Sequence, residues 1–341
     1  MDWPSKLRQG PISSPEFSVI PRACALVAFI VGASTVAAFS KPEKKFAQLT
    51  DGPVWSFDLA STGCQRAWGD PNSSAATNEI TFAGDDTVAM AYATMVRAPS
   101  EKNWDYQACM FTIDARSGTQ ISQIRLDERR PVTSLYQPIV AETSDGKIRL
   151  TLDEFSTVYG RGLEVAAARQ PITPSKEHWT GAHWTMFRAE RDGTLWYDGS
   201  SEAKLLGKYT PDATFIYPLG PERVLVIAGK RFALFRGDGT QVKNESFSRE
   251  GVHFAAVSSD HRKFAVSVYL WGVGDPSYLE EERIVVYDAE NGSVVTSVPS
   301  NPLPKTQSWT ALSPDGSLLA VGAGTTLRLF RLPSIAQSQS K

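Results

Sequence analysis

Cysteine and histidine are scarce in this chain, whose 341 residues include three cysteines and four histidines. His178 and His183 are the nearest approach to a metal-binding pair, but their spacing does not place both on one side of a strand, and no third ligand is evident nearby. The chain also lacks the Gly-x-Ser-x-Gly, phosphate-loop, His-Glu-x-x-His and Cys-x-x-Cys motifs. We therefore expect no catalytic residue, no metal and no cofactor.

An excess of charge of one sign is missing as well. The 35 basic and 37 acidic residues leave a net charge of −2, with histidine neutral. The basic pair Arg129-Arg130 directly follows the acidic pair Asp127-Glu128, and such mixed charges cancel any steering field. A nucleic-acid partner is not expected, because binding to phosphates needs a clustered basic surface.

One apolar run stands out, near the N-terminus. Lys6, Arg8 and Arg22 precede the apolar stretch 23–39, and small residues at 36–38 offer a cleavage site, a pattern typical of an export signal. The run is shorter than the roughly 20 residues of a comfortable membrane span, so a retained single-pass anchor is an alternative and a buried helix a third. We expect a periplasmic or extracellular protein.

This interpretation divides the chain into four parts. They are a signal peptide or anchor at 1–38, a linker at 39–52, a folded domain at 53–334 and a flexible tail at 335–341. Export would place Cys64 and Cys109 in an oxidising compartment, where they could form a disulfide. The alternative is two independent buried thiols, since Cys24 falls inside the signal.

Long helical periodicity is absent, and a repeat takes its place. Ser313–Gly322, running on into Leu327–Leu332, reads as an apolar strand, a tight Asp-Gly turn and further strands, and Phe254–Val268 with Arg283–Gly292 repeats this order. Asp-Gly and Asn-Gly turns favour hairpins because they adopt positive φ at little cost. A unit that cannot bury its own faces predicts a stacked or ring-closed array.

These units resemble the WD40-type repeats, most closely over residues 283–298 and 309–332 and more loosely over about residues 50–332. Tyr287-Asp288 stands where that family has its Trp-Asp pair, and Ile113-Asp114 is a weaker match. The Gly-His pair that usually opens each repeat is missing, so the resemblance is to a degenerate member. It implies an all-β fold, a β-propeller of four-stranded antiparallel blades, and by itself no particular function.

Five units are recognisable, and six or seven blades remain open. The glycine of the turn between the third and fourth strands is expected at Gly118, Gly193, Gly239 and Gly292. The long interval between the first two could hide part of another blade. The last unit lacks a fourth strand, and we expect Val54–Leu59 to supply it by pairing with Leu327–Leu332, because closure leaves no exposed edge.

Three long connections between second and third strands are expected at 95–107, 155–182 and 271–282, all at the same end of their blades because the strands alternate in direction. Loops of this length are usually functional or disordered. Their aromatic and histidine residues are the candidate ligand-binding residues, namely Trp104, Tyr106, His178, Trp179, Trp271 and Tyr278.

The sequence therefore favours an exported, non-enzymatic propeller that binds a protein, peptide or glycan through this face. A secreted propeller enzyme, lactonase-like or quinoprotein-like, acting at the central channel is one alternative. A structural scaffold of an envelope complex is another.

Overall fold

The structure is a computed structural model that describes residues 46, 48–62, 73–97, 104–128, 139–152, 155–171, 183–184, 186–199, 202–210, 214–272, 279–301, 303 and 308–334. Residues 45–341 group as one compact unit, separate from 1–44. Within the described residues, no helix is long and apolar enough to cross a membrane.

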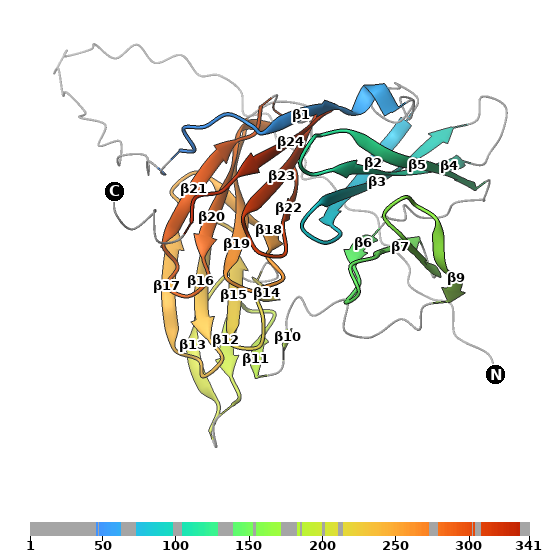
Figure 1. Cartoon of the computed structure of the whole chain (residues 1–341). Helices are drawn as coiled ribbons and strands as arrows, with labels where there is room; N and C mark the ends of the chain where they lie inside the picture. The colour runs from blue at the N-terminus through green and yellow to red at the C-terminus, as the bar shows by residue number, and fades with distance from the viewer. Residues whose placement is uncertain are drawn as a thin grey trace, which may run out of the picture. The chain divides into compact units, whose positions relative to one another are not determined.

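Six four-stranded antiparallel sheets make up this unit, and we call them blades 1 to 6 in chain order (Figure 1). Blade 1 contains β2 (Ser73–Phe82), β3 (Thr87–Arg97), β4 (Trp104–Asp114) and β5 (Gln120–Glu128). Blade 2 contains β6 (Ile139–Glu142), β7 (Ile148–Leu152), β8 (Phe155–Tyr159) and β9 (Val165–Pro171). Blade 3 contains β10 (His183–Trp184), β11 (Phe187–Ala189), β12 (Thr194–Tyr197) and β13 (Lys204–Lys208).

The other three blades follow the same plan. Blade 4 contains β14 (Thr214–Pro218), β15 (Arg223–Ala228), β16 (Arg231–Arg236) and β17 (Gln241–Ser246). Blade 5 contains β18 (Gly251–Val257), β19 (Lys263–Trp271), β20 (Leu279–Asp288) and β21 (Val294–Pro299). Blade 6 contains β22 (Trp309–Leu312), β23 (Leu318–Ala323) and β24 (Thr326–Arg331), completed by β1 (Trp55–Asp58) from the other end of the chain.

The predicted closure of the last blade is confirmed. Strand β1 runs antiparallel to β24, with Trp55 opposite Leu329 and Asp58 opposite Thr326 (Figure 1). The indole Nε1 of Trp55 donates a 2.8 Å hydrogen bond to the carbonyl of Ala115 in blade 1. Strand β1 therefore completes blade 6 and also attaches it to blade 1.

Trp55 also explains one of the turn glycines. Gly118 has φ +72°, and a Cβ there would lie 2.8 Å from Cγ of Trp55. Any side chain at this position would be strained in its backbone and would collide with the indole. The glycine that makes the turn between β4 and β5 thus also leaves room for the closing strand.

The described residues form six blades, one of the numbers that the sequence left open. The extra blade comes from the interval between Gly118 and Gly193, where 155–171 forms β8 and β9 and is not a loop. Every residue of β9 is exposed, so the strand lacks the alternation of buried and exposed residues that marks a half-buried strand. The expected long connection at 155–182 was therefore wrong.

The expected position of Gly193 was also wrong. It lies between β11 and β12, the second and third strands of blade 3, whereas Gly118, Gly239 and Gly292 do follow third strands. The strands β10 and β11 have two and three residues. Elements this short carry no readable periodicity, so their residues were assigned to a single third strand.

The Tyr287-Asp288 pair ends the third strand of blade 5, as the WD40 resemblance implies. Asp288 accepts a hydrogen bond from the backbone N–H of Glu290 and so holds the turn that leads to Gly292. The Tyr287 ring is fully buried. It stacks on Phe264 at 5.2 Å and meets Phe232 of blade 4 edge-on at 5.1 Å, which places it in the core between blades 4 and 5.

Neighbouring blades meet chiefly through their first strands. Strand β2 contacts β6 and β22, β22 contacts β18, β18 contacts β15 and β16, and β14 contacts β10 and β11. These contacts connect the blades in the order 2, 1, 6, 5, 4, 3. The first strands of blades 2, 1, 6 and 5 therefore lie next to one another in this order.

Charged side chains reinforce two of these junctions. Arg161 of blade 2 binds Asp86 and Asp114 of blade 1, each at 2.7 Å. The buried ammonium of Lys263 in blade 5 donates to the carbonyls of Gly316, at 2.8 Å, and Pro333, at 3.1 Å, beside blade 6. Burial lowers the pKa of Lys263, and the two carbonyls replace part of the hydration that it loses.

Part of the segment expected as a linker lies against blade 5. Gln48 forms a parallel bridge with Ser297 of β21, and Leu49 N donates to the Ser297 carbonyl at 3.0 Å. The ring of Phe46 packs on Phe247 with a centroid distance of 6.2 Å. These residues cover the outer edge of β21, an edge that strand-rich proteins usually protect.

Shortening the N-terminus should separate these two roles. A chain that starts at Asp51 loses the Phe46 and Leu49 contacts, and we expect it to stay folded with unfolding free energy lower by ~1–3 kcal/mol, from the apolar area exposed. A chain that starts at Ala60 also loses β1 and exposes the edge of β24, so we expect it to aggregate. Urea unfolding and light scattering measure both effects, and equal behaviour of the two chains would contradict the closing role of β1.

Removing the Tyr287 ring tests the core between blades 4 and 5. We expect Tyr287→Ala to lower the unfolding free energy by ~3–5 kcal/mol, because it leaves a cavity where a large buried side chain stood. Tyr287→Phe keeps the stacked ring and serves as the matched control, with a loss well below that of Ala. The measurement is chemical denaturation of the purified variants, and similar losses for Ala and Phe would show that the ring packing is not what matters.

Candidate functional site

The sequence-predicted site residues are only partly within the described residues. Trp271 is the last residue of β19, is 41% exposed and meets the Tyr269 ring edge-on at 6.3 Å. Trp104 and Tyr106 lie in β4, opposite Arg97 and Met95 of β3. They belong to a strand and not to the loop expected at 95–107, so that loop is shortened to the connection 98–103.

The remaining candidates, His178, Trp179 and Tyr278, lie outside the described residues. Cys109 is buried in β4 and disulfide-bonded. The other two cysteines, 24 and 64, both lie outside the described residues, so the pairing of Cys64 with Cys109 stays a prediction.

The corrected connections still share one end of their blades. Residues 98–103 and 272–278 join second to third strands, and 172–182 joins the last strand of blade 2 to the first strand of blade 3. In a sheet of four alternating strands, both kinds of connection emerge at the same end. The topology is therefore consistent with the face chosen from the sequence, although one of its three segments is of a different kind.

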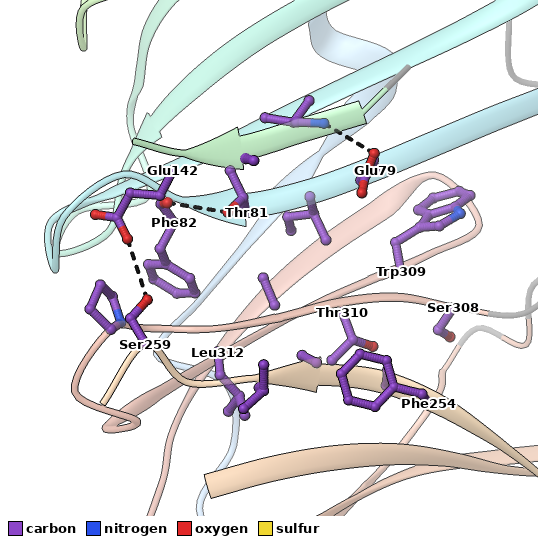
Figure 2. Close-up of a pocket in the computed structure, with 18 of the residues that line it drawn as sticks. Glu79, Thr81, Phe82, Glu142, Phe254, Ser259, Ser308, Trp309, Thr310 and Leu312 are labelled. Atoms are coloured by element: carbon purple, nitrogen blue, oxygen red, sulfur yellow. Dashed lines mark hydrogen bonds between the residues drawn. The ribbon is translucent and has the colours of Figure 1, made fainter. Parts of the chain in front are cut away.

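A cavity of about 990 Å³ is bounded by the first strands of blades 1, 2, 5 and 6. It extends from the turns that follow these strands, at Ser144, Ser259 and Pro314, to Ser267 and Ser308 near the opposite end. Figure 2 shows two facing walls, with Glu79, Thr81, Phe82 and Glu142 on one and Phe254, Ser308, Trp309 and Thr310 on the other. Sequence reasoning did not single out any of these side chains.

Strand alternation explains how a charged residue comes to face this cavity. In β2, Ile80 and Phe82 belong to the core shared with blade 6 and also border the cavity. Glu79 and Thr81 alternate with them on the other face of the strand and line the part of the cavity beside β6. The Glu79 carboxylate accepts a 3.0 Å hydrogen bond from the backbone N–H of Val140 in β6. Burial raises the pKa of Glu79 to about 7, and the Val140 hydrogen bond opposes the shift.

Glu142, at the end of β6, supplies the second carboxylate of this wall. Its Oε1 accepts a 2.7 Å hydrogen bond from the backbone N–H of Gly84, and its Oε2 lies 3.5 Å from the hydroxyl of Ser259 (Figure 2). The first bond connects blade 2 to blade 1, and the second reaches across to blade 5. Glu142 thus helps to position the turn end of the cavity as well as giving it charge.

A histidine and two serines lie near the opposite end. His253 lines the cavity. Desolvation by the surrounding protein lowers the pKa of its ring, and the charge of Glu282 acts in the opposite direction. Glu282 is itself buried, and its Oε1 accepts bonds from the Ser267 hydroxyl at 2.7 Å and the Ser308 N–H at 3.0 Å. Because Ser267 donates directly to the carboxylate, its hydroxyl is not activated by a histidine base as a nucleophile requires.

The facing wall is aromatic and rich in hydroxyl groups. Phe254 stacks on Tyr217 of blade 4 with ring centroids 4.6 Å apart, and Trp309 lines the cavity beside it. Thr310 is 9% exposed, and its hydroxyl has no hydrogen-bond partner among the described residues. A buried hydroxyl without a partner costs free energy.

No metal centre is found in the part of the chain that the structure describes, since no group of three His, Cys, Asp or Glu side chains there could hold an ion. What the cavity offers is two carboxylates, a histidine, hydroxyl groups and aromatic faces. These groups suit binding by hydrogen bonds, charge and stacking.

Comparisons with known proteins give matches in fold alone. No protein-family model and no curated protein matches the chain. Solved structures that match include one of the mitotic checkpoint complex (14% identity, 91% of this chain and 99% of that chain, TM-score 0.36). Another is the WD40 domain of Pan2 from Neurospora crassa (11% identity, 84% of this chain and 98% of that chain, TM-score 0.37).

These scores are low, so the fold assignment is based on the chain itself. Its six four-stranded antiparallel sheets, the N-terminal strand that completes the last of them and the Tyr287-Asp288 pair at the end of a third strand are those of a WD40-like β-propeller. The fold alone leaves the activity open.

The raised pKa of Glu79 predicts a pH-dependent stability. Between its ordinary value of 4.5 and about 7 the folded chain keeps a proton that the unfolded chain releases, so stability falls as pH rises through this window. Glu79→Gln, neutral in both states, should match the wild type at pH 4.5 and exceed its unfolding free energy by ~1–3 kcal/mol at pH 8.

Urea unfolding across this pH range measures the difference. Glu222→Gln, on an exposed turn outside the cavity, is the matched control and should change stability by less than ~0.5 kcal/mol. An equal effect of both substitutions, or a Glu79→Gln benefit that does not depend on pH, would rule out a destabilising charge at Glu79.

Proposed function

We propose that this chain is an exported, non-enzymatic β-propeller that binds a segment of a protein partner at the cavity between blades 1, 2, 5 and 6. The observation that carries the proposal is the cavity itself, a polar and aromatic space of about 990 Å³ bounded by the first strands of four blades. Cavities of this size with a few convergent polar groups are the usual sites of ligand binding.

The contacts around the cavity favour binding over catalysis. Ser267 and Ser308 both donate to Glu282, so these hydroxyls hold a buried carboxylate in place. His253 lines the cavity but forms no hydrogen bond to either serine in the described part of the chain. An acyl-transfer site would need the histidine between the serine and the carboxylate.

The end of the blades at which second and third strands are joined, which we call the b–c end, extends the proposed surface. Trp271 is exposed at the end of β19, and the connections 98–103, 172–182 and 272–278 emerge at the same end of their blades. Large aromatic side chains at such positions provide contact area at a low cost in side-chain entropy. A partner that enters the cavity with one side chain would use this surface for the rest of its segment.

Export is part of the proposal and is based on the apolar stretch 23–39 with its preceding basic residues. It predicts that the mature protein is found in the periplasm or medium. Cell fractionation with N-terminal sequencing measures both the location and the cleavage point. Recovery of the intact chain from the cytoplasm would contradict export, and recovery of the intact chain from membranes would favour the retained anchor.

Site-specific photo-crosslinking tests the binding proposal. A photoreactive amino acid at Ser144, which is exposed and lines the cavity, should capture a discrete partner protein, and one at Trp271 should capture the same partner if the b–c end contributes. The matched control is the same probe at exposed Lys230 in blade 4. Thr81→Trp, which places a large ring in the cavity, should abolish capture at Ser144 while thermal unfolding confirms the fold.

The outcomes separate the candidate functions. Capture at Ser144 that disappears with Thr81→Trp supports a cavity-binding module. Equal capture at Ser144 and Lys230, or capture that survives the blocking substitution, would show that the cavity is not the site. Capture at Trp271 alone would place the interaction on the b–c end and not in the cavity.

A further inference from the structure

We propose that the cavity binds a positively charged side chain, a lysine or arginine of the partner segment, between the acidic wall of Glu79 and Glu142 and the aromatic wall of Phe254 and Trp309. This inference depends on the proposed function and specifies its ligand chemistry. It comes from which charged groups surround the cavity and from which of them have partners.

The charge of the cavity is one-sided. Its lining includes Glu79 and Glu142 with His253 as the remaining titratable group, and no lysine, arginine or aspartate among the described residues. Glu282 lies directly behind Ser267 and Ser308 and adds a third carboxylate, itself buried, near the His253 end. Burial lowers the pKa of His253 and so disfavours the charged form of its ring. The field in the cavity therefore attracts cations.

Two other acidic side chains of blade 1, in contrast, have a cationic partner within the chain. Asp86 and Asp114, in turns of blade 1, share the guanidinium of Arg161 at 2.7 Å each. The two cavity carboxylates instead accept bonds from the backbone N–H groups of Val140 and Gly84. No ion pair joins either of them to a lysine or arginine of the described chain. A cationic ligand can therefore occupy the place that a lysine or arginine of the chain would take in an ion pair.

An independent feature of the opposite wall points the same way. Thr310 lines the cavity, is 9% exposed, and its hydroxyl oxygen has no hydrogen-bond partner within the described residues. Figure 2 shows it between Phe254 and Trp309, facing the acidic wall. The hydroxyl oxygen itself is covered by surrounding atoms, so the groups of this wall that can attract a cation are the neighbouring rings, through their π faces.

The desolvation cost of the Glu79 carboxylate in the unbound protein favours a cationic ligand over a neutral one. A carboxylate that burial holds partly protonated becomes fully ionised when a cation approaches, so the cation recovers the desolvation cost. A neutral sugar or amide would leave both carboxylates without a countercharge. Positively charged side chains match both walls at once.

Short capped peptides with one variable residue test the inference on the full mature protein. The probes are acetyl-Gly-X-Gly-amide, with X arginine, lysine, citrulline or norleucine, titrated by calorimetry or NMR. Citrulline keeps the length and shape of the arginine side chain without the charge, and norleucine keeps the four-carbon stem of lysine without its ammonium group. We expect the arginine and lysine peptides to bind about tenfold or more tightly than their neutral counterparts. Equal binding of charged and neutral peptides would overturn the inference.

Variants then locate the charge effect. Glu79→Gln and Glu142→Gln should each weaken binding of the basic peptides about tenfold, with Glu222→Gln as the matched control that leaves it unchanged. Binding unaffected by either cavity substitution would place the cation elsewhere and overturn the proposal. The wild-type comparison of charged with neutral peptides needs no variant, so a variant that fails to fold does not decide the result.

The pH dependence gives a separate measurement. Affinity for the arginine peptide should fall as pH drops from 8 to 6, because Glu79, whose pKa burial raises to about 7, gains a proton. Glu79→Gln should remove this dependence, whereas His253→Gln should leave it in place, and Glu142 remains as the third titratable group of the lining. A pH dependence that is unchanged in both variants would contradict the assignment.

Failure of this inference is distinguishable from failure of the proposed function. Capture of a protein at Ser144 together with equal binding of charged and neutral peptides would keep the partner and reject the charge. Selective binding of basic peptides without protein capture would keep the charge and reject the protein partner. Tight binding of free spermidine with weak binding of both basic peptides would identify a small polyamine instead and overturn the peptide assignment.

Discussion

The pairing of β1 with β24 is the contact on which the rest of the structure depends. It joins residues near the two ends of the folded unit, with Trp55 opposite Leu329. It completes the sheet whose first strand, β22, forms a wall of the cavity. Through the Trp55–Ala115 hydrogen bond it also fixes blade 6 to blade 1. The arrangement of Thr310 and Trp309 opposite Glu79 therefore depends on a strand that is far from all three in sequence.

The sequence predicted the parts of the fold that repeat with a clear alternation. Blades 4, 5 and 6 have long apolar strands and Gly turns, and their positions and the closing strand were correct. The first hairpin of blade 2 was recognisable, but it was not identified as a separate blade, because the outer strand, Val165–Pro171, is exposed along its whole length. The short strands of blade 3 were merged because two and three residues carry no period. Packing between blades, and not local pattern, determines these strands.

The candidate site was harder to predict than the fold. Aromatic residues in long connections are visible in a sequence, and Trp271 is indeed exposed. Glu79 and Glu142 gave a weaker signal, since each is a single acidic residue next to an apolar strand segment, where a solvated edge position is the simpler explanation. Their meeting at one wall depends on the contact of β2 with β6, and no spacing in the chain reveals which first strands become neighbours.

The attachment of Phe46, Gln48 and Leu49 to the rest of the folded unit has a mechanical consequence. These residues precede β1, and they are held by the Leu49–Ser297 hydrogen bond, the Gln48 bridge and the Phe46–Phe247 ring contact. A pull on the chain ahead of Phe46 is resisted first by these few contacts and only afterwards by the four paired residues of β1. Under force this segment can therefore detach from the folded unit and lengthen the chain while β1 stays paired with β24.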